Sequence, residues 1–378
     1  MRLWQIWVVG VPIPDVTRFV RVCVTCAVVL ALAPLSSASG QSAAAKRLPA
    51  PPKVSTRSPA NSPAATAATA TSKPAYSAAA ARARRARLSR ARASARSREI
   101  AVLTQPRFKT DAQGEIVPDI RAEAAIIYNP ATGQVLWEEK AFDKRSIASI
   151  TKVMTAICFL EDNPDLSETV MVDRADTRGA SVTHLRAYER VSLQNLLHLA
   201  LISSDNAAAR TLARTSSYGA QGFVARMNEK AAELGLEDTH YVDPSGLLSE
   251  NVSSAYDMAR LIAYATDDDL LSTIMRTQEY SFRTSRRGLT IHSTNQLLRA
   301  SNIDVRGGKT GFITRSGYCL ATLLRLPDLN QSVAVVVLGA RSNAGRFWET
   351  RHLLDWISSK AQLFVGREGQ PPHPPAQH

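Results

Sequence analysis

Strand-forming patterns lie at both ends of the folded part of this chain, and helical patterns fill the region between them. The apolar segments 124–128 and 134–138 flank residues 129–133, whose Asn, Pro, Thr and Gly are typical of a turn, so they predict a β-hairpin. Strand patterns return at 317–326 and at 333–338. We therefore expect an α+β fold in which both chain ends contribute to one antiparallel five-stranded sheet, with a helical lobe inserted between them.

The helical patterns define that inserted lobe. A helix is expected from Ile147 to Asp162, where Pro164 prevents continuation, and an apolar periodic run extends over 193–212. Further helices are expected at 222–234, 254–264 and 270–276. A last helix, 346–360, has its apolar residues spaced to pack on a sheet.

The formal net charge of +13 belongs to one segment. Residues 42–98 contain thirteen lysines and arginines and no acidic residue, whereas the rest of the 378-residue chain is close to neutral. This distribution argues against a nucleic-acid-binding globular domain, which would carry its own basic face. Because the segment consists mainly of Ala, Ser, Pro, Thr and Arg, it cannot bury enough apolar surface to order itself, and we expect a linker.

The start of the chain has the layout of a secretory signal peptide. An apolar run over 22–33 follows two arginines and precedes small residues suited to cleavage before Gln41. We expect export to the periplasm or cell envelope, with an uncleaved N-terminal membrane anchor as the alternative. The predicted organisation is a signal peptide at 1–40, a disordered linker at 41–115, a folded domain at 116–362 and a disordered tail at 363–378.

The cysteines do not indicate a disulfide scaffold. Cys23 and Cys26 lie inside the apolar run of the signal and leave with it. Cys158 and Cys319 stand in apolar contexts, which favours buried free thiols over a disulfide between them. The seven histidines show no zinc-ligand spacing, so no metal and no organic cofactor is expected.

Three short motifs could carry chemistry: Ser149-Ile150-Thr151-Lys152, Ser204-Asp205-Asn206 and Lys309-Thr310-Gly311. Each is weak alone, since the first two are also helix-capping patterns and the third is also a Gly-rich strand entry. Together they occur in a fixed order, 55 and then 105 residues apart, at a helix start, in the helical block and on a late strand. A site between the sheet and the helical lobe would draw on these three places.

The residue types in these motifs suit acyl transfer. A serine hydroxyl needs a neighbouring base to become a nucleophile, and Lys152 shares a helix face with Ser149 three residues earlier. A lysine can be that base when burial lowers its pKa. Ser204 could relay a proton, Asn206 could hold a substrate amide, and Lys309 and Thr310 could hold a carboxylate. Gly311 would let a substrate backbone approach closely.

This combination resembles the low-molecular-mass penicillin-binding proteins, the D-alanyl-D-alanine carboxypeptidase and endopeptidase family of serine peptidases. The resemblance runs from about Ala122 to about Ser359 and includes the residues that flank the three motifs. It implies a β-lactamase/transpeptidase-like fold. The loop Asp243-Pro244-Ser245-Gly246-Leu247 also looks like the family's. The resemblance implies a D-Ala-D-Ala peptidase that acts on peptidoglycan stem peptides, as a carboxypeptidase or as an endopeptidase on cross-links, and that β-lactams inhibit covalently.

The resemblance also implies residue roles. The catalytic residues would be Ser149 as acylated nucleophile, Lys152 as general base, and Ser204. The backbone N–H groups of Ser149 and Phe312 would form an oxyanion hole. Substrate would be held by Asn206, Lys309, Thr310, Gly311, Phe312 and Arg346, the last binding the terminal carboxylate, although a surface arginine is its alternative interpretation.

Several alternatives stay open. A class A β-lactamase shares the three motifs but also needs a Glu-x-x-x-Asn loop, which is not found in the segment after Ser204. A catalytically lapsed envelope-binding protein is a second alternative. Ile313 departs from the family's usual threonine, and the short C-terminal region looks more like the endopeptidase branch. Residues 42–98 are interpreted as an inert spacer, with contact to an anionic envelope surface as the alternative and no nucleic-acid partner.

Overall fold

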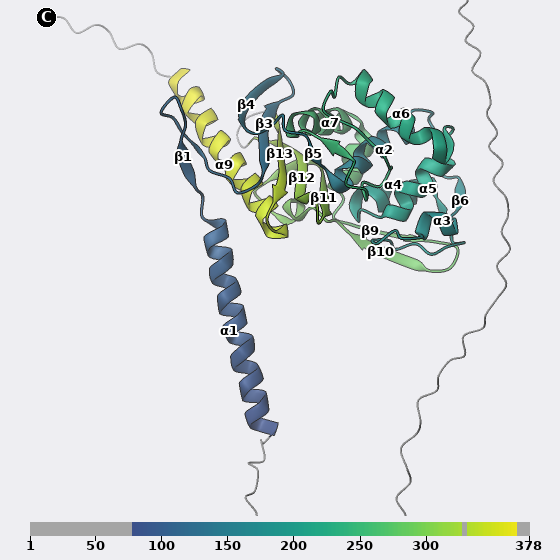
Figure 1. Ribbon diagram of the computed structural model, residues 1–378, viewed down its shortest axis with the longest axis horizontal. Helices are drawn as coiled ribbons and strands as arrows, with labels where there is room; N and C mark the ends of the chain where they lie inside the picture. Colours follow the sequence, from purple (N-terminus) through teal and green to yellow (C-terminus); the bar gives the residue numbers. More distant parts are fainter. Residues whose placement is uncertain (1–77, 327–330, 369–378) are drawn as a thin grey trace, which may run out of the picture. The chain divides into compact units, whose positions relative to one another are not determined.

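The computed structural model of the protein describes residues 78–326 and 331–368. The predicted signal peptide and residues 41–77 of the predicted linker lie outside these residues. A five-stranded sheet stands beside a lobe of helices (Figure 1). Within the described residues, no helix has the length and apolar character needed to cross a membrane.

The sheet is assembled from both ends of the folded region, as the sequence predicts. Its strand order is β11-β12-β13-β3-β4, and every neighbouring pair is antiparallel. The early strands form a hairpin and the late strands form the rest: β3 (Ala124–Asn129), β4 (Gln134–Glu139), β11 (Asp304–Ile313), β12 (Gly317–Arg325) and β13 (Ser332–Ala340). Strand β11 is therefore an edge strand.

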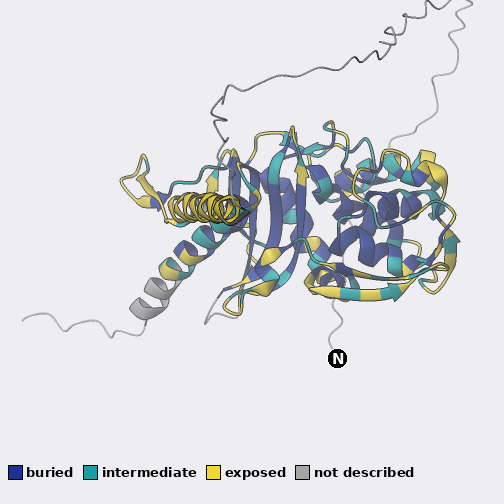
Figure 2. Cartoon of the chain, turned by 90° about the horizontal axis from the view of Figure 1, so that it is seen from below, coloured by how far each residue is buried: buried dark blue, intermediate teal, exposed yellow. Residues whose placement is uncertain are grey.

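The two faces of the sheet belong to two separate cores. In β13, Ala334, Val336 and Leu338 pack with the helical lobe, and the alternate residues Val333 and Val335 pack with the C-terminal helix. This alternation follows from the two-residue period of a strand. Helix α9 (Asn343–Glu368) covers one face of the sheet, and α7 (Ala255–Asp267) covers the other. Figure 2 shows the strands and the inner helices as the buried parts of the chain.

The helical lobe surrounds a central buried helix, α2 (Thr151–Leu160), which a short 3₁₀ turn, η1 (Ala148–Ile150), precedes. Its buried face includes Met154, Ile157 and Phe159. The other helices of the lobe are α3 (Arg174–Thr177), α4 (Leu193–Ile202), α5 (Asn206–Thr215), α6 (Gly219–Glu233) and α8 (Asp269–Arg276). Cys158 and Cys319 are buried free thiols, which confirms the expectation for both.

Smaller elements connect these parts, and several have no counterpart in the sequence-based expectation. The two-stranded units are β1 (Phe108–Thr110) with β2 (Ile116–Pro118), β5 (Arg145–Ser146) with β8 (Val252–Ser253), β6 (Thr169–Met171) with β7 (Arg190–Ser192), and β9 (Glu279–Arg283) with β10 (Gly288–His292). A second 3₁₀ turn, η2, covers Gln296–Arg299. In β9 and β10, exposed residues alternate with partly or fully buried ones, so these strands lack an apolar run that sequence analysis could find.

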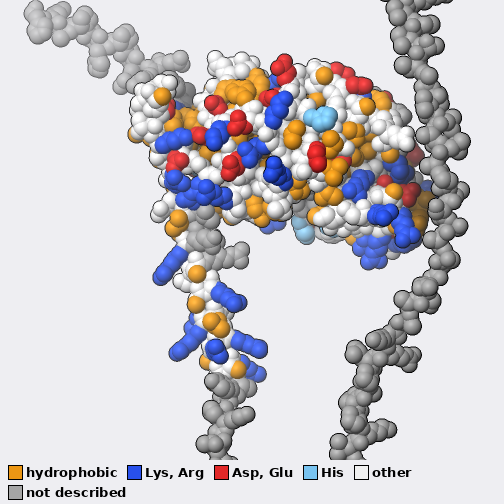
Figure 3. Space-filling view, viewed as in Figure 1, with side chains coloured by type: hydrophobic (Ala, Val, Ile, Leu, Met, Phe, Trp, Pro, Cys, Tyr) orange, Lys and Arg blue, Asp and Glu red, His pale blue; other side chains and the backbone are white. Residues whose placement is uncertain are grey.

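The arginine-rich region differs from the expectation of a linker without regular structure up to residue 115. Residues Ala78–Thr104 form helix α1, and β1 follows within the same predicted linker. Alanine and arginine both have high helix propensity, which favours a helix even without an apolar face. The described side chains of 80–95 are exposed, and arginine side chains line α1 in Figure 3. The C-terminal helix also continues past residue 362, where a tail was expected, to Glu368.

Candidate active site

The three sequence motifs meet at one cleft between β11 and the helical lobe. The cleft has a volume of about 490 Å³. Residues of all three motifs and Arg346 line it: Ser149, Ser204, Asn206, Thr310, Gly311, Phe312 and Arg346. Lys152 and Lys309 are fully or almost fully buried and reach this group through hydrogen bonds. All nine residues predicted for the site are thus brought together.

Ser149 lies in the 3₁₀ turn that begins helix α2, and Lys152 lies in the first turn of that helix. The Lys152 Nζ donates hydrogen bonds to Ser149 Oγ (2.9 Å), to Asn206 Oδ1 (2.6 Å) and to the Ser245 carbonyl oxygen (2.5 Å). Residue Ala148 has a φ of 48°, in the left-handed region that non-glycine residues rarely adopt. The turn therefore holds Ser149 next to a buried amine at the cost of an unfavourable backbone conformation.

Burial lowers the pKa of Lys152 to about 7. Loss of solvation is the largest cause; Asp205 and Asp243 oppose it, and Arg210 adds to it. A neutral amine has two N–H donors and one lone pair. If Asn206 and Ser245 take the two donors, the lone pair of Lys152 is left for the hydroxyl of Ser149. The geometry thus lets Lys152 receive the proton of Ser149 at neutral pH.

The Ser245 carbonyl was not among the predicted site residues, and its position depends on Asp243. The Asp243 carboxylate accepts hydrogen bonds from the backbone N–H groups of Ser245 and Gly246 and from the Asn251 side chain. Gly246 has a φ of 74°, and a Cβ there would lie 2.1 Å from the Ala148 carbonyl oxygen. Only glycine fits this close approach. The sequence Asp-Pro-Ser-Gly at residues 243–246 is the feature from which this loop could have been predicted as part of the site.

Ser204 and Asn206 form the helical-lobe wall of the cleft. The predicted helical run 193–212 is interrupted here: α4 ends at Ile202, Ser204 has a φ of 63°, and Asp205 caps α5 by accepting a hydrogen bond from the Ala208 N–H (3.0 Å). The interruption turns Ser204 into the cleft. The Asn206 Nδ2 donates to the Ala180 carbonyl oxygen (2.6 Å), which fixes its amide with Oδ1 toward Lys152.

Lys309 and Thr310 form the opposite wall on β11. The Lys309 Nζ donates to Ser204 Oγ (2.9 Å) and to the Thr310 carbonyl oxygen (2.9 Å), so it links the two walls. Burial, with repulsion from Lys152 and Arg346, holds the pKa of Lys309 well below its ordinary value. The Thr310 hydroxyl lies 2.6 Å from the hydroxyl of Thr294, a cleft residue that carried no recognisable sequence signal.

Gly311 and Phe312 continue β11 past the nucleophile. A Cβ at Gly311 would lie 2.6 Å from the Ile147 carbonyl oxygen and 3.2 Å from the Ser149 backbone nitrogen. The backbone of β11 therefore passes directly beside Ser149, which requires glycine at this position. The Phe312 ring stacks on Tyr318 at 4.2 Å between centroids and is 49% exposed, so it forms an accessible rim of the cleft.

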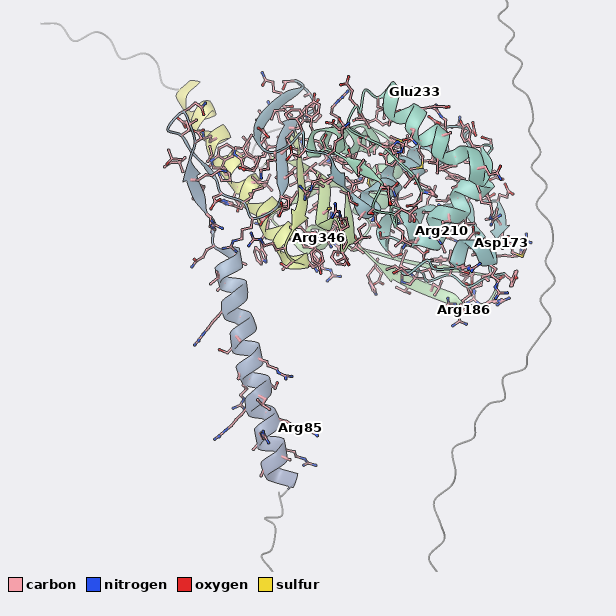
Figure 4. All side chains as sticks on the ribbon, in the orientation of Figure 1. Arg85, Asp173, Arg186, Arg210, Glu233 and Arg346 are labelled. Carbon is pink, nitrogen blue, oxygen red and sulfur yellow. The ribbon has the colours of Figure 1, made fainter. Side chains whose placement is uncertain are left out.

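Arg346 begins the C-terminal helix beside the strands of the sheet (Figure 4). It is buried rather than a surface residue, with 6% exposure. Its guanidinium donates to the carbonyl oxygens of Gly311 (2.9 Å) and Cys319 (3.1 Å), and loss of solvation lowers its pKa to about 10. Its buried Nε has no hydrogen-bond partner among the described residues. A cation thus lines the cleft close to β11.

No acidic side chain is among the described residues that line the cleft. Within 78–326 and 331–368, no group of three or more His, Cys, Asp and Glu side chains is arranged to hold a metal ion. The ionisable groups at the cleft are therefore the amines of Lys152 and Lys309 and the guanidinium of Arg346. This arrangement can activate a serine and bind an anionic group next to it.

Comparisons with known proteins agree on one relationship. The Peptidase_S11 family profile, described as D-alanyl-D-alanine carboxypeptidase, matches residues 110–342. A D-alanyl-D-alanine endopeptidase of Escherichia coli (strain K12) is 33% identical over 247 residues, covering 64% of this chain and 79% of the relative. The D-alanyl-D-alanine carboxypeptidase DacC of the same organism is 32% identical over 253 residues, covering 63% of this chain and 62% of the relative.

A similar fold is found in a solved structure. The crystal structure of the Streptomyces K15 DD-transpeptidase has a TM-score of 0.60 and 27% sequence identity, covering 63% of this chain and 97% of that chain. The similarity confirms the predicted transpeptidase-like α+β fold.

Proposed function

Because the chain belongs to the D-alanyl-D-alanine carboxypeptidase family of serine peptidases, we propose that Ser149 is the nucleophile of its peptidase reaction and that Lys152 is the general base. The observation that carries this proposal is the contact of 2.9 Å between Lys152 Nζ and Ser149 Oγ, made by a fully buried lysine whose pKa is about 7. Such a lysine is substantially neutral at physiological pH and can accept a proton.

In the proposed acylation step, Ser149 Oγ attacks the carbonyl carbon between two D-alanine residues of a stem peptide while its proton passes to Lys152 Nζ. The developing oxyanion would accept hydrogen bonds from the backbone N–H groups of Ser149 and Phe312. The proximity of the β11 backbone to the Ser149 nitrogen supports this pair of donors. The C–N bond then breaks, and the leaving amine takes the proton from Lys152 through Ser204.

In the second step, water hydrolyses the ester on Ser149 and restores the free serine. The Thr310 hydroxyl, the Lys309 Nζ and the Arg346 guanidinium would hold the terminal carboxylate of the substrate, and Asn206 would hold a backbone amide. Since the described residues that line the cleft include no carboxylate that could activate water as in a class A β-lactamase, we expect β-lactams to acylate Ser149 and leave slowly. Rapid turnover of a chromogenic cephalosporin would instead support the β-lactamase alternative.

Covalent labelling tests the proposal. Fluorescent penicillin should label the wild-type protein, and Ser149→Ala should not be labelled while it unfolds at an unchanged temperature. An unlabelled wild type would support the lapsed binding protein instead. Labelling of Ser149→Ala would show that a residue other than Ser149 is the nucleophile.

Of the two possible peptidase reactions, we expect cleavage of cross-links, an endopeptidase activity, before carboxypeptidase activity. The endopeptidase relatives are 31–33% identical to this chain over the matched residues, compared with 29–32% for the carboxypeptidase relatives. Incubation with muropeptide monomers and cross-linked dimers separates the two activities by product mass. Conversion of dimers to monomers indicates an endopeptidase, whereas free D-alanine from monomers indicates a carboxypeptidase.

The proposed location is the periplasm or cell envelope, because the N-terminal sequence has the pattern of an export signal and the substrate lies there. Residues 42–98 would act as a spacer. The exposed arginines of α1, such as Arg85 in Figure 4, supply the alternative, contact with an anionic envelope surface. Deletion of residues 42–98 should leave envelope retention unchanged if the segment is a spacer.

A further inference from the structure

A second cavity adjoins the candidate active site where β11 ends. It has a volume of about 380 Å³, and it shares two lining residues, Phe312 and Thr314, with the cleft. Its other walls come from the turn between β11 and β12, from the end of β13 and from β5. Three arginines and one acidic residue line it: Arg145, Arg315, Arg341 and Glu123.

Among the described residues, the three arginines lack a hydrogen-bonded protein partner, although Arg341 is close enough to Glu349 to interact with its carboxylate through charge. Among residues 78–326 and 331–368, none of their guanidinium groups makes a hydrogen bond or an ion pair within 4 Å, and Glu123 pairs with none of them. The Nε of Arg145 is also buried from solvent. Buried polar groups nearly always have a partner, so an unpaired buried donor in a cationic cavity points to a ligand that supplies the acceptor.

Arg145 is held in place although it is unpaired. It lies in β5, four residues before Ser149 in the sequence, and it pairs with Ser253 of β8. A Cβ at Gly339 would lie 2.9 Å from the Arg145 Nη2, so the guanidinium packs against the backbone of β13. Its position is therefore fixed by the pairing of β5 with β8 and by the backbone of β13.

The proposed function gives the direction in which a bound peptide would run. An extended substrate can lie along the open edge of β11, with its terminal carboxylate near Thr310 and Arg346 and its cleaved bond at Ser149. Its preceding residues then run past Ile313 to Thr314, toward the second cavity. At about 3.3 Å per residue, the three positions from Gly311 to Thr314 span about 10 Å. This distance corresponds to the second or third substrate residue before the cleaved bond.

We propose that the cavity bounded by Arg145, Arg315 and Arg341 binds a free carboxylate on the second or third residue before the cleaved bond of the acyl-donor peptide. The proposal rests on the proposed peptidase function and adds a specificity determinant to it. The ligand is an anionic side chain or α-carboxylate of the same peptide, because the cavity adjoins the cleft and shares the lining residues Phe312 and Thr314 with it.

Matched synthetic peptides test this subsite. Two peptides carry the bond that the muropeptide assay shows to be cleaved, a terminal D-Ala-D-Ala or a cross-link, and differ only in having a carboxylate or its amide on the third residue before that bond; a second pair differs on the second residue. In wild type, kcat/KM should be roughly tenfold or more higher for the carboxylate member of at least one pair, the range expected for a charge-assisted hydrogen bond. In Arg145→Gln and in Arg315→Gln, the ratio for that pair should fall toward one.

The ratio of kcat/KM for the carboxylate peptide to that for the amide peptide separates carboxylate binding by the cavity arginines from a purely structural role of these residues. Arg90→Gln, which removes an exposed arginine of α1 that lines neither cavity, should keep the wild-type ratio. If both cavity variants slow the two peptides equally and keep the ratio, or if wild type shows no preference in either pair, the subsite proposal is overturned. Penicillin labelling, measured in parallel, distinguishes failure of the subsite proposal from failure of the proposed function. Labelling without a carboxylate preference refutes the subsite alone. Absence of both labelling and cleavage refutes the proposed function and the subsite with it.

Discussion

The pH dependence of acylation tests how the cleft activates Ser149, and Asn206→Asp is the most informative perturbation. The Asn206 Oδ1 lies 2.6 Å from the Lys152 Nζ. The substitution replaces a neutral acceptor by a carboxylate of nearly the same shape. A negative charge at this distance favours the ammonium form of Lys152, so the pKa of the amine must rise from about 7.

Coulomb's law gives a lower bound for the effect. Two unit charges 2.6 Å apart attract by about 1.6 kcal/mol even at the dielectric constant of water, which corresponds to a rise of about one pKa unit. The effect is larger at the lower effective dielectric of a buried site. Because the neutral amine is the active form, the acylation rate rises with pH through the pKa of Lys152. The variant should therefore acylate at least about tenfold more slowly than wild type at pH 6.

The measurement is the second-order rate constant for labelling by fluorescent penicillin between pH 5.5 and 9.5, which reports groups of the free enzyme. Wild type should show a rising limb with its midpoint near pH 7. In Asn206→Asp the midpoint should move up by at least about one pH unit. Asn206→Ala is the control, because it removes the side-chain hydrogen bonds of Asn206 without adding charge and should not move the midpoint upward.

Two results would refute the reasoning. A wild-type profile that is flat across this range, or that rises only above pH 9, would mean that Lys152 does not titrate as its burial requires. An unchanged midpoint in Asn206→Asp, with labelling retained, would mean that the proton acceptor of Ser149 is not the amine beside Asn206.

Three further predictions concern packing, charge and thiol access. Gly311→Ala should reduce penicillin labelling at least about tenfold, because its Cβ would lie 2.6 Å from the Ile147 carbonyl oxygen and displace the strand beside the nucleophile; near wild-type labelling would contradict this. Glu161→Gln should lower the thermal unfolding temperature at pH 7, since Arg226 hydrogen bonds hold the pKa of Glu161 below 4.5; the stabilisation exists above pH 4.5 and is lost in acid, so the difference from wild type should narrow at lower pH. Cys158 should not react with a thiol reagent at pH 8 in the native protein, because burial raises its pKa to about 12, and it should react after denaturation; rapid native reaction at this residue would contradict its burial.

The sheet and the motif positions could be predicted because their signals are local. Apolar runs mark β3, β12 and β13, and the Gly-rich entry marks the strand that carries Lys309. The break between α4 and α5 was harder, because the apolar period continues across it. There Asp205 caps the second helix, and the left-handed Ser204 separates the two, which an apolar pattern cannot reveal.

The contacts that tune the site could not be predicted from the sequence. Lys152 is positioned by Asn206 and by the Ser245 carbonyl, which lie 54 and 93 residues away in the chain. A backbone carbonyl has no residue-type signal, and the same holds for the packing of Thr294 against Thr310. The helix at Ala78–Thr104 was missed for a different reason: its composition lacks an apolar face, and intrinsic propensity rather than burial favours it.

The geometry around Ser149 also limits how this fold can be stabilised. Two fully or nearly buried amines, Lys152 and Lys309, share a small volume, and Ala148 and Ser204 hold left-handed backbone conformations. Each of these features opposes folding, and the rest of the domain offsets them. Selection for thermostability alone would therefore favour replacement at these four positions first. A library screened for heat resistance should lose the penicillin-reactive serine site before it loses the sheet, so stability and reactivity must be selected together in any effort to engineer this protein.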